Sequence, residues 1–221
     1  MLTFLRLAPL AASVKRERSC SLRYRGRMPK VSAEYRAERR AHILAAARSC
    51  FARDGFQGTS MADIVDEAGV SSGAVYRYFP SKDAVIEAIA ADNLDQVVAV
   101  IRQSIEAGLT AESAIAAVLD FVTARHAEDG FAAIALLVWS EAMRNPVLAE
   151  RLRTANAAAA QLLRSSKRRG RESAAVSDLL LCVLPGYLMQ LAVGGPTAVK
   201  RIPRTVAKVF ADSTDADQSP T

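Results

Sequence analysis

Side chains that could bind nucleic acid gather in one short stretch of the chain, residues 58–82. Small and hydroxyl-bearing residues come first, and hydrogen-bonding aromatics and an arginine follow. Hydroxyl, phenol and guanidinium groups bind phosphate oxygens and base edges, and small residues let a helix backbone approach the floor of a groove. The candidate contacts to duplex DNA are Thr59, Ser60, Ser71, Ser72, Gly73, Tyr76, Arg77, Tyr78 and Lys82.

Two short helices joined by a tight turn are expected to position these side chains. The first is predicted over residues 61–68, where Thr59 or Ser60 can cap the N-terminus and Asp63 can complete a partial capping box. Gly69 supplies the backbone freedom for the turn. The second helix begins in the run 70–73 and ends at Tyr78-Phe79, because Pro80 follows.

The rest of the chain is predicted to be helical as well. Ile43, Leu44, Ala47 and Phe51 follow a 3.6-residue period from Glu34 onward, and Asp54-Gly55 ends that helix. Ser81 caps a long helix that starts at Lys82. Glycine and proline punctuation then predicts helices over 111–128, 131–144, 147–167, 173–193 and 197–211. The expected fold class is all-α, with a three-helix helix-turn-helix head followed by a larger helical domain.

The stretch from Ile43 to Ile86 resembles the TetR family of bacterial repressors. The resemblance rests on the pattern T-x-x-x-I-x-x-x-A-G-V-S-x-G-x-x-Y-x-Y-F-x-S-K, found here as Thr59, Ile64, Ala68, Gly69, Val70, Ser71, Gly73, Tyr76, Tyr78, Phe79, Ser81 and Lys82. Two positions depart mildly from the family: Val65 replaces the usual alanine, and Tyr78 stands where histidine is frequent. Neither departure removes a group that DNA binding needs.

The resemblance implies a homodimer whose first three helices bind DNA. It also implies that the later helices enclose a ligand pocket and that the last two form a four-helix interface with the partner. Ligand entry would alter the spacing of the two heads and release a near-palindromic operator. The resemblance therefore predicts a ligand-released transcriptional repressor, and a ligand-dependent activator is the alternative, because the sequence does not say where the operator lies.

Residues of the C-terminal part are assigned to the pocket and the interface by residue type and position. Candidate pocket residues are Phe121, Phe131, Trp139, Met143 and Tyr187. Each of these could instead be an ordinary core residue. The interface is predicted where apolar residues of the last two helices lack other cover, at Leu180, Leu184, Leu188, Leu191, Val199, Ile202, Val206 and Phe210.

The segments expected along the chain are a basic leader over 1–33, the head over 34–81, the ligand-binding and dimerisation domain over 82–211, and a frayed tail over 212–221. The leader carries eight Lys and Arg against one Glu, 8 − 1 = +7, which leaves 6 − 7 = −1 for the remainder. The basic balance therefore belongs to the leader. Translation beginning at Met28 and a DNA-contacting arm are both open readings, whereas a signal peptide would need its charges before the apolar run.

Other classes of function are disfavoured by what the sequence contains. Three separated cysteines and two histidines give no metal-ligand spacing, and no nucleophile set or phosphate-binding glycine loop occurs, so we expect no enzyme, metal or cofactor. An architectural DNA binder would have a basic body. The longest apolar run, Leu179 to Val193, is interrupted by Pro185, Gly186 and Gln190, so no membrane span is expected. These observations fit a cytoplasmic bacterial protein.

Overall fold

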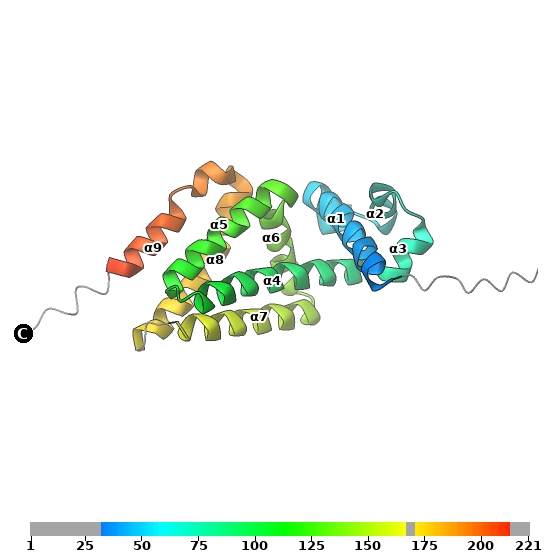
Figure 1. Cartoon of the computed structure of the whole chain (residues 1–221). Coiled ribbons are helices and arrows are strands. Elements are labelled where there is room, and N and C mark those ends of the chain that lie inside the picture. Colours follow the sequence, from blue (N-terminus) through cyan, green and yellow to red (C-terminus); the bar gives the residue numbers. More distant parts are fainter. Residues whose placement is uncertain (1–31, 167–170, 213–221) are drawn as a thin grey trace, which may run out of the picture. The chain divides into compact units, whose positions relative to one another are not determined.

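The computed structural model describes residues 32–166 and 171–212. Their secondary structure is helical, which confirms the all-α class, and Figure 1 shows the arrangement. The helices are α1 (Ala33–Gly58), α2 (Met61–Ala68), α3 (Ser72–Tyr78), α4 (Lys82–Glu106), α5 (Ala111–Asp129), α6 (Phe131–Ala142), α7 (Pro146–Arg164), α8 (Arg171–Val199) and α9 (Ile202–Asp212). The predicted leader and tail lie outside the described residues, except at their inner ends.

The local signals for the first three helices are confirmed in the structure. The backbone of α1 leaves helical geometry at Gly55 (φ 72°), the glycine at which the helix was predicted to end. Ser60 caps α2, and its side chain and that of Asp63 form a reciprocal capping box. Gly69 ends α2 in the left-handed conformation (φ 61°), which is unfavourable for a residue with a β-carbon. We call α1–α3 the head.

The head shares its hydrophobic core with helices that follow it. Ile43 and Phe51 of α1, Ile64 of α2 and Val75 of α3 are buried in one cluster with the N-terminal half of α4. The same cluster includes residues of α6 and α7: Ile134, Val138, Ala142 and Leu148. In Figure 1, α4 runs from the head along α7. The predicted boundary between residues 81 and 82 therefore crosses a continuous core.

A second cluster fills the part of the molecule away from the head. It combines the C-terminal half of α4 with α5, α8 and α9. Leu188, Leu191, Val199 and Val206 are buried in it, while Leu184 and Ile202 are half-buried against it. The expectation that these interface candidates lack other cover is wrong, because α5 and its neighbours already cover them within one chain. The side chains of Leu180 and Phe210 lie outside the described ones.

Helix α8 agrees with its predicted form at two positions. The backbone leaves helical geometry at Gly195 (φ 68°), within the break predicted between residues 193 and 197, and Pro185 lies inside the helix. The segment Leu181–Val199 is long and apolar enough, by length and composition, to cross a membrane. The interruptions at Pro185, Gly186 and Gln190 therefore do not exclude a segment of membrane-spanning length, contrary to the sequence-based expectation. The core helix of a folded protein passes the same test, and this helix contributes several residues to the second cluster.

We expect Gly130→Ala to be more destabilising than Gly69→Ala. Both glycines have positive φ, so each alanine should cost about 1–2 kcal/mol of left-handed strain. A β-carbon at Gly69 meets nothing within 4 Å, whereas one at Gly130 would lie 2.9 Å from Cβ of Ala52 in α1. That collision should add about 1–3 kcal/mol. Urea unfolding measures the free energy of unfolding of each variant. Equal losses of stability would show that a β-carbon at residue 130 does not collide with Ala52 of α1.

Candidate nucleic-acid interface

Helix α3 presents most of the predicted DNA contacts to solvent. Ser71, Ser72, Gly73 and Arg77 are exposed, Tyr76 is 48% exposed, and only Val75 of the helix is buried. Burial of Val75 against Ile64 of α2 fixes which face of α3 points outward. A β-carbon built on Gly73 meets nothing within 4 Å, so this face is open at the start of the helix. The arrangement is a helix-turn-helix whose second helix is free to enter a groove.

Several of the predicted hydroxyl contacts are already used inside the head. Thr59 is 2% exposed, and its hydroxyl donates to the carbonyl of Gly55 at 2.9 Å. The predicted contact between Thr59 and DNA is therefore wrong, because burial removes it from the surface. The Ser60 hydroxyl donates to Asp63 in the capping box, and Ser71 accepts the N–H of Ala74 as the cap of α3. These two serines remain exposed while they hold the helix starts.

The capping box also fixes the charge of its acidic member. The Ser60 backbone N–H donates to Asp63 Oδ2 at 2.7 Å, and the Ser60 hydroxyl donates to the same oxygen at 2.8 Å. These hydrogen bonds, the backbone one first, hold the pKa of Asp63 below its ordinary value. A carboxylate at the N-terminus of α2 suits the dipole of that helix.

Lys82 connects α4 to the loop that joins α1 and α2. Its ammonium donates to the carbonyl of Phe56 at 2.7 Å and to that of Thr59 at 3.0 Å. A lysine ammonium has three N–H donors, so one is left for a DNA phosphate. The sequence suggested a phosphate contact, and the structure adds a role in holding the head to the first turn of α4.

Sequence reasoning assigned no role to the arginines near the start of α1. The Arg40 guanidinium lies 5.4 Å from the centre of the Phe79 ring, directly after α3. Arg39 donates to the hydroxyl of Tyr35 at 2.9 Å and lies 5.5 Å from that ring. Both contacts keep a positive charge beside the α3 end of the head. The i, i+4 spacing of Tyr35 and Arg39 was the available signal for the second pair.

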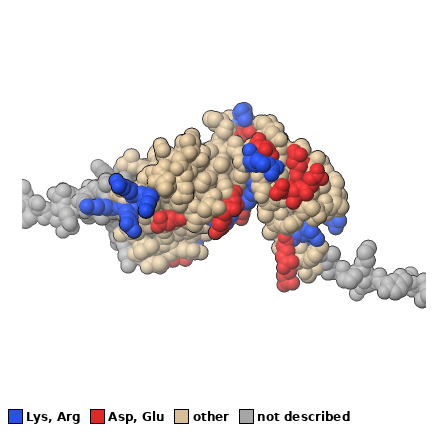
Figure 2. Space-filling view, turned by 90° about the horizontal axis from the view of Figure 1, so that it is seen from above, with Lys and Arg blue, Asp and Glu red and all other residues tan. Residues whose placement is uncertain are grey.

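Charge is unevenly distributed over the surface. Figure 2 shows carboxylates gathered on one part of the head, and Lys and Arg gathered over the end that carries α9. The exposed acids of α2 include Asp66 and Glu67, while the basic group comprises Lys200, Arg201, Arg204 and Lys208. The acidic side of α2 is unsuited to a phosphate backbone, which leaves α3 and the start of α1 as the groove-facing side.

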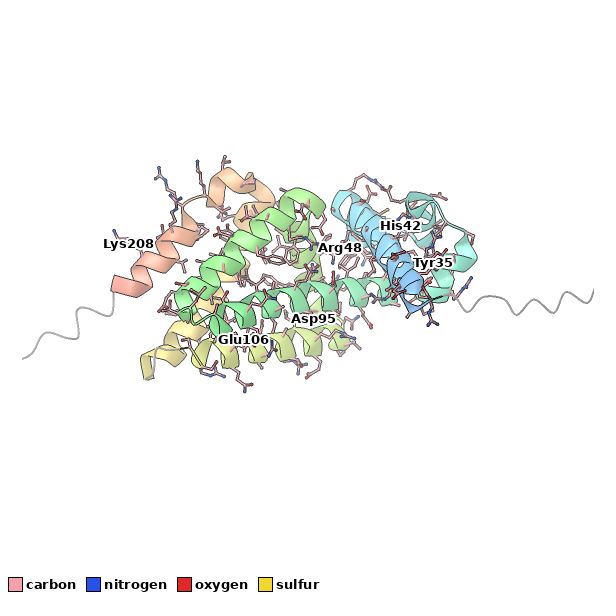
Figure 3. The ribbon with its side chains drawn as sticks, viewed as in Figure 1. Tyr35, His42, Arg48, Asp95, Glu106 and Lys208 are labelled. Atoms are coloured by element: carbon pink, nitrogen blue, oxygen red, sulfur yellow. The ribbon has the colours of Figure 1, made fainter. Side chains whose placement is uncertain are left out.

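A partly buried ion-pair network, centred on the buried Arg48, ties α1 to α4 and α5. Arg48 of α1 is buried, and its Nη2 lies 2.5 Å from Asp92 Oδ2 while its Nη1 lies 3.8 Å from Asp129 Oδ2. Asp129 also pairs with Arg125, which donates to Gln96 of α4 at 2.7 Å. Figure 3 shows Arg48 between α1 and the neighbouring helices. The network therefore supplements the shared core with charge pairs that have a fixed geometry.

A narrow internal cavity of about 50 Å³ lies beyond the head, between α4, α5, α6, α7 and α8. Two predicted pocket residues, Phe131 and Trp139, line it. Phe121 does not line it, and instead packs edge-on against Phe131 with ring centres 5.9 Å apart. Met143 is 82% exposed past the end of α6, so its prediction as a pocket residue is wrong.

Tyr187 has a different environment from the one predicted. It is buried away from the cavity lining, and its hydroxyl lies 2.6 Å from that of Thr123. Burial raises the pKa of Tyr187, so the phenol stays neutral and joins α8 to α5.

Comparison with known proteins agrees with this geometry. Residues 43–89 match the model of the bacterial regulatory proteins, tetR family. The HTH-type transcriptional regulator UidR of Escherichia coli is 31% identical over 69% of this chain and 81% of UidR. The HTH-type transcriptional repressor Rv1474c of Mycobacterium tuberculosis is 33% identical over 76% of this chain and 89% of that protein. The structure of Salmonella enterica GusR aligns with a TM-score of 0.64 at 26% identity, covering 83% of this chain and 97% of GusR.

The exposed second helix of the helix-turn-helix defines a DNA-binding protein. The chain belongs to the TetR family of bacterial regulatory proteins and is a DNA-binding transcriptional regulator. This membership confirms the predicted family, the helix-turn-helix and the expectation that the chain is not an enzyme.

We expect Lys82→Met to destabilise the protein by about 1–3 kcal/mol, because it removes two charge-assisted hydrogen bonds and keeps most of the side-chain volume. Lys200→Met, at an exposed lysine after α8, is the matched control and should change stability little. Urea unfolding is the measurement. Unchanged stability of Lys82→Met, together with a lower salt dependence of DNA binding, would mean that the lysine acts on phosphate alone.

Proposed function

We propose that this regulator is a homodimeric repressor that binds a near-palindromic operator in the bacterial cytoplasm and is released by a small molecule. The open face of α3 is the observation that carries the proposal, since a groove-entering helix needs uncovered small residues and free polar side chains. Ser72, Gly73, Tyr76, Arg77 and Tyr78 supply the base-edge and phosphate contacts. Arg39 and Arg40 add phosphate contacts beside them.

The dimer forms through the exposed face of α8. Leu179, Met189 and Val193 are large apolar residues that are 56%, 51% and 82% exposed, and Cys182 is exposed between them. Their spacing of three, then seven, then four residues keeps them on one face of a helix. An exposed apolar stripe of this kind indicates a helix–helix interface, and a two-fold axis brings the same stripe of a second copy against it. This stripe differs from the set that the sequence suggested, whose described members are buried or half-buried.

The cavity is coupled to the head through residues shared by the two clusters. Trp139 lines the cavity and packs against both clusters. Val138, its neighbour on α6, lies in the core of the head. A typical ligand needs about 300 Å³ or more, so binding must move the lining helices apart. A ligand that binds only the expanded form shifts the population toward it, and α4 and α6 carry the displacement to the head.

We expect Gly73→Ala to weaken operator binding by roughly tenfold or more while leaving the fold intact. The added methyl meets no protein atom within 4 Å, and alanine favours a helix by about 1 kcal/mol over glycine. The methyl would, however, stand between the α3 backbone and the groove floor. Fluorescence anisotropy with an operator selected from a genomic library gives the affinity, and thermal unfolding gives the stability. Non-operator DNA serves as the control, and undiminished operator affinity would refute the placement of α3.

We expect Val193→Asp to convert the dimer into a folded monomer. The charge would have to be buried in the interface, but it stays solvated in the single chain because Val193 is 82% exposed. Leu109→Asp makes the same kind of change at a 42% exposed residue outside α8 and should leave the dimer intact. Sedimentation velocity distinguishes the two variants. Operator affinity should fall with dimerisation, since two half-site contacts are no longer linked, and a dimeric Val193→Asp would place the interface elsewhere.

A further inference from the structure

The internal cavity is apolar apart from two asparagines. Its lining includes Val97, Ile101, Val118 and Leu152, and no Asp, Glu, Lys or Arg belongs to it. A charged ligand group would therefore meet no countercharge in the cavity and would lose its hydration on entry. An uncharged, largely apolar molecule loses little by the same transfer.

One buried polar side chain breaks this apolar lining. Asn93 of α4 is 5% exposed and lines the cavity. Its carboxamide Oδ1 and Nδ2 are both buried without a hydrogen-bond partner among the described residues. Such a group costs the fold about 1–3 kcal/mol of stability, so an apolar residue of similar shape would fit this position better. The second asparagine, Asn156 of α7, is exposed at the edge of the cavity.

A groove on the surface lies next to the cavity that contains Asn93. An open groove of about 870 Å³ runs between α4 and α7, and Leu94, Val98 and Ala155 line both the groove and the cavity. Small side chains, Ala91 and Ala158 among them, also line the groove. A ligand that parts α4 from α7 along this line passes directly from the groove to Asn93.

We propose that the cavity binds an uncharged, mainly apolar molecule carrying one amide, hydroxyl or carbonyl group, and that the Asn93 carboxamide selects this group. The inference rests on the proposed ligand response and assigns its chemical class. The carboxamide offers one acceptor and two N–H donors, so it pairs with a group that donates, accepts or does both. The apolar part of the ligand lies against the valines and isoleucines of α4 and α5.

The test uses four straight-chain, eight-carbon probes with different end groups: octanamide, 1-octanol, octanoate and octylammonium. Trp139 is the only tryptophan of the chain and lines the cavity, so its fluorescence reports binding to the full-length dimer. Wild-type protein is compared with Asn93→Leu, which keeps the shape of the side chain. Asn156→Leu is the matched control at the edge of the cavity.

We expect octanamide and 1-octanol to bind wild-type protein at least roughly tenfold more tightly than either charged probe. In Asn93→Leu the affinity for octanamide should fall by about tenfold. The melting temperature of the unliganded variant should rise, because the unpaired carboxamide is gone. Asn156→Leu should bind octanamide like wild type. A merely structural asparagine would give the opposite change in melting temperature and no change in probe selectivity.

Three results would overturn the assignment: tighter binding of a charged probe, no binding of either neutral probe, or equal binding of octanamide by wild type and Asn93→Leu. Operator binding is measured separately, by anisotropy with and without saturating octanamide. If the probe binds through Asn93 and the operator stays bound, the cavity assignment holds and the proposed release fails. If the operator binds normally and no neutral probe binds, the cavity assignment fails while DNA binding stands.

Discussion

The three helices of the head cannot bury their apolar residues without the helices that follow. Ile64 and Val75 lie in one buried cluster with residues of three later helices, including Ile89 of α4, Ile134 of α6 and Leu148 of α7. A unit of the head's size exposes a large share of its apolar surface when alone. The orientation of α3 is therefore set by helices that also line the cavity. Because of this constraint, a movement of these helices in the larger domain also moves α3, which presents the DNA-binding surface.

Polar contacts restrict how the helices around this shared core can be positioned. An apolar contact tolerates sliding, whereas Arg48 must keep its guanidinium near both Asp92 and Asp129. From the first turn of α4, Lys82 donates to one carbonyl near the end of α1 and to one in the α1–α2 loop. Because removal of one partner leaves a buried charge uncompensated, each contact favours a single position of α1 over its neighbours. Ion pairs and hydrogen bonds thus fix the head to α4 and α5, whereas apolar packing holds its core.

The sequence could predict the head because its signals are local. The capping box at Ser60 and the positive φ at Gly69 depend on residues within four positions, and both were expected and found. Thr59 shows where such reasoning stops: a threonine at a helix start was expected to face DNA, and a hydrogen bond to Gly55 turns it inward. The contacts of Lys82 reach back over more than twenty residues, so no local pattern reveals them.

The larger domain could not be predicted at the same level, because the middle of α8 has large apolar residues both on its core-facing side and on its exposed side. Leu188 and Leu191 face the core, while Met189 and Val193 face solvent, and residue type does not distinguish the two pairs. Only the positions of α5, α6 and α7 decide which side is covered. Asn93 presents the reverse case. In the sequence it is one polar residue in an amphipathic helix, where solvent exposure is the usual outcome. Asn93 stands out because its carboxamide is buried without a hydrogen-bond partner among the described residues. Such a group lowers the stability of the unliganded protein, and under the proposed assignment it gains hydrogen bonds when a ligand enters the cavity.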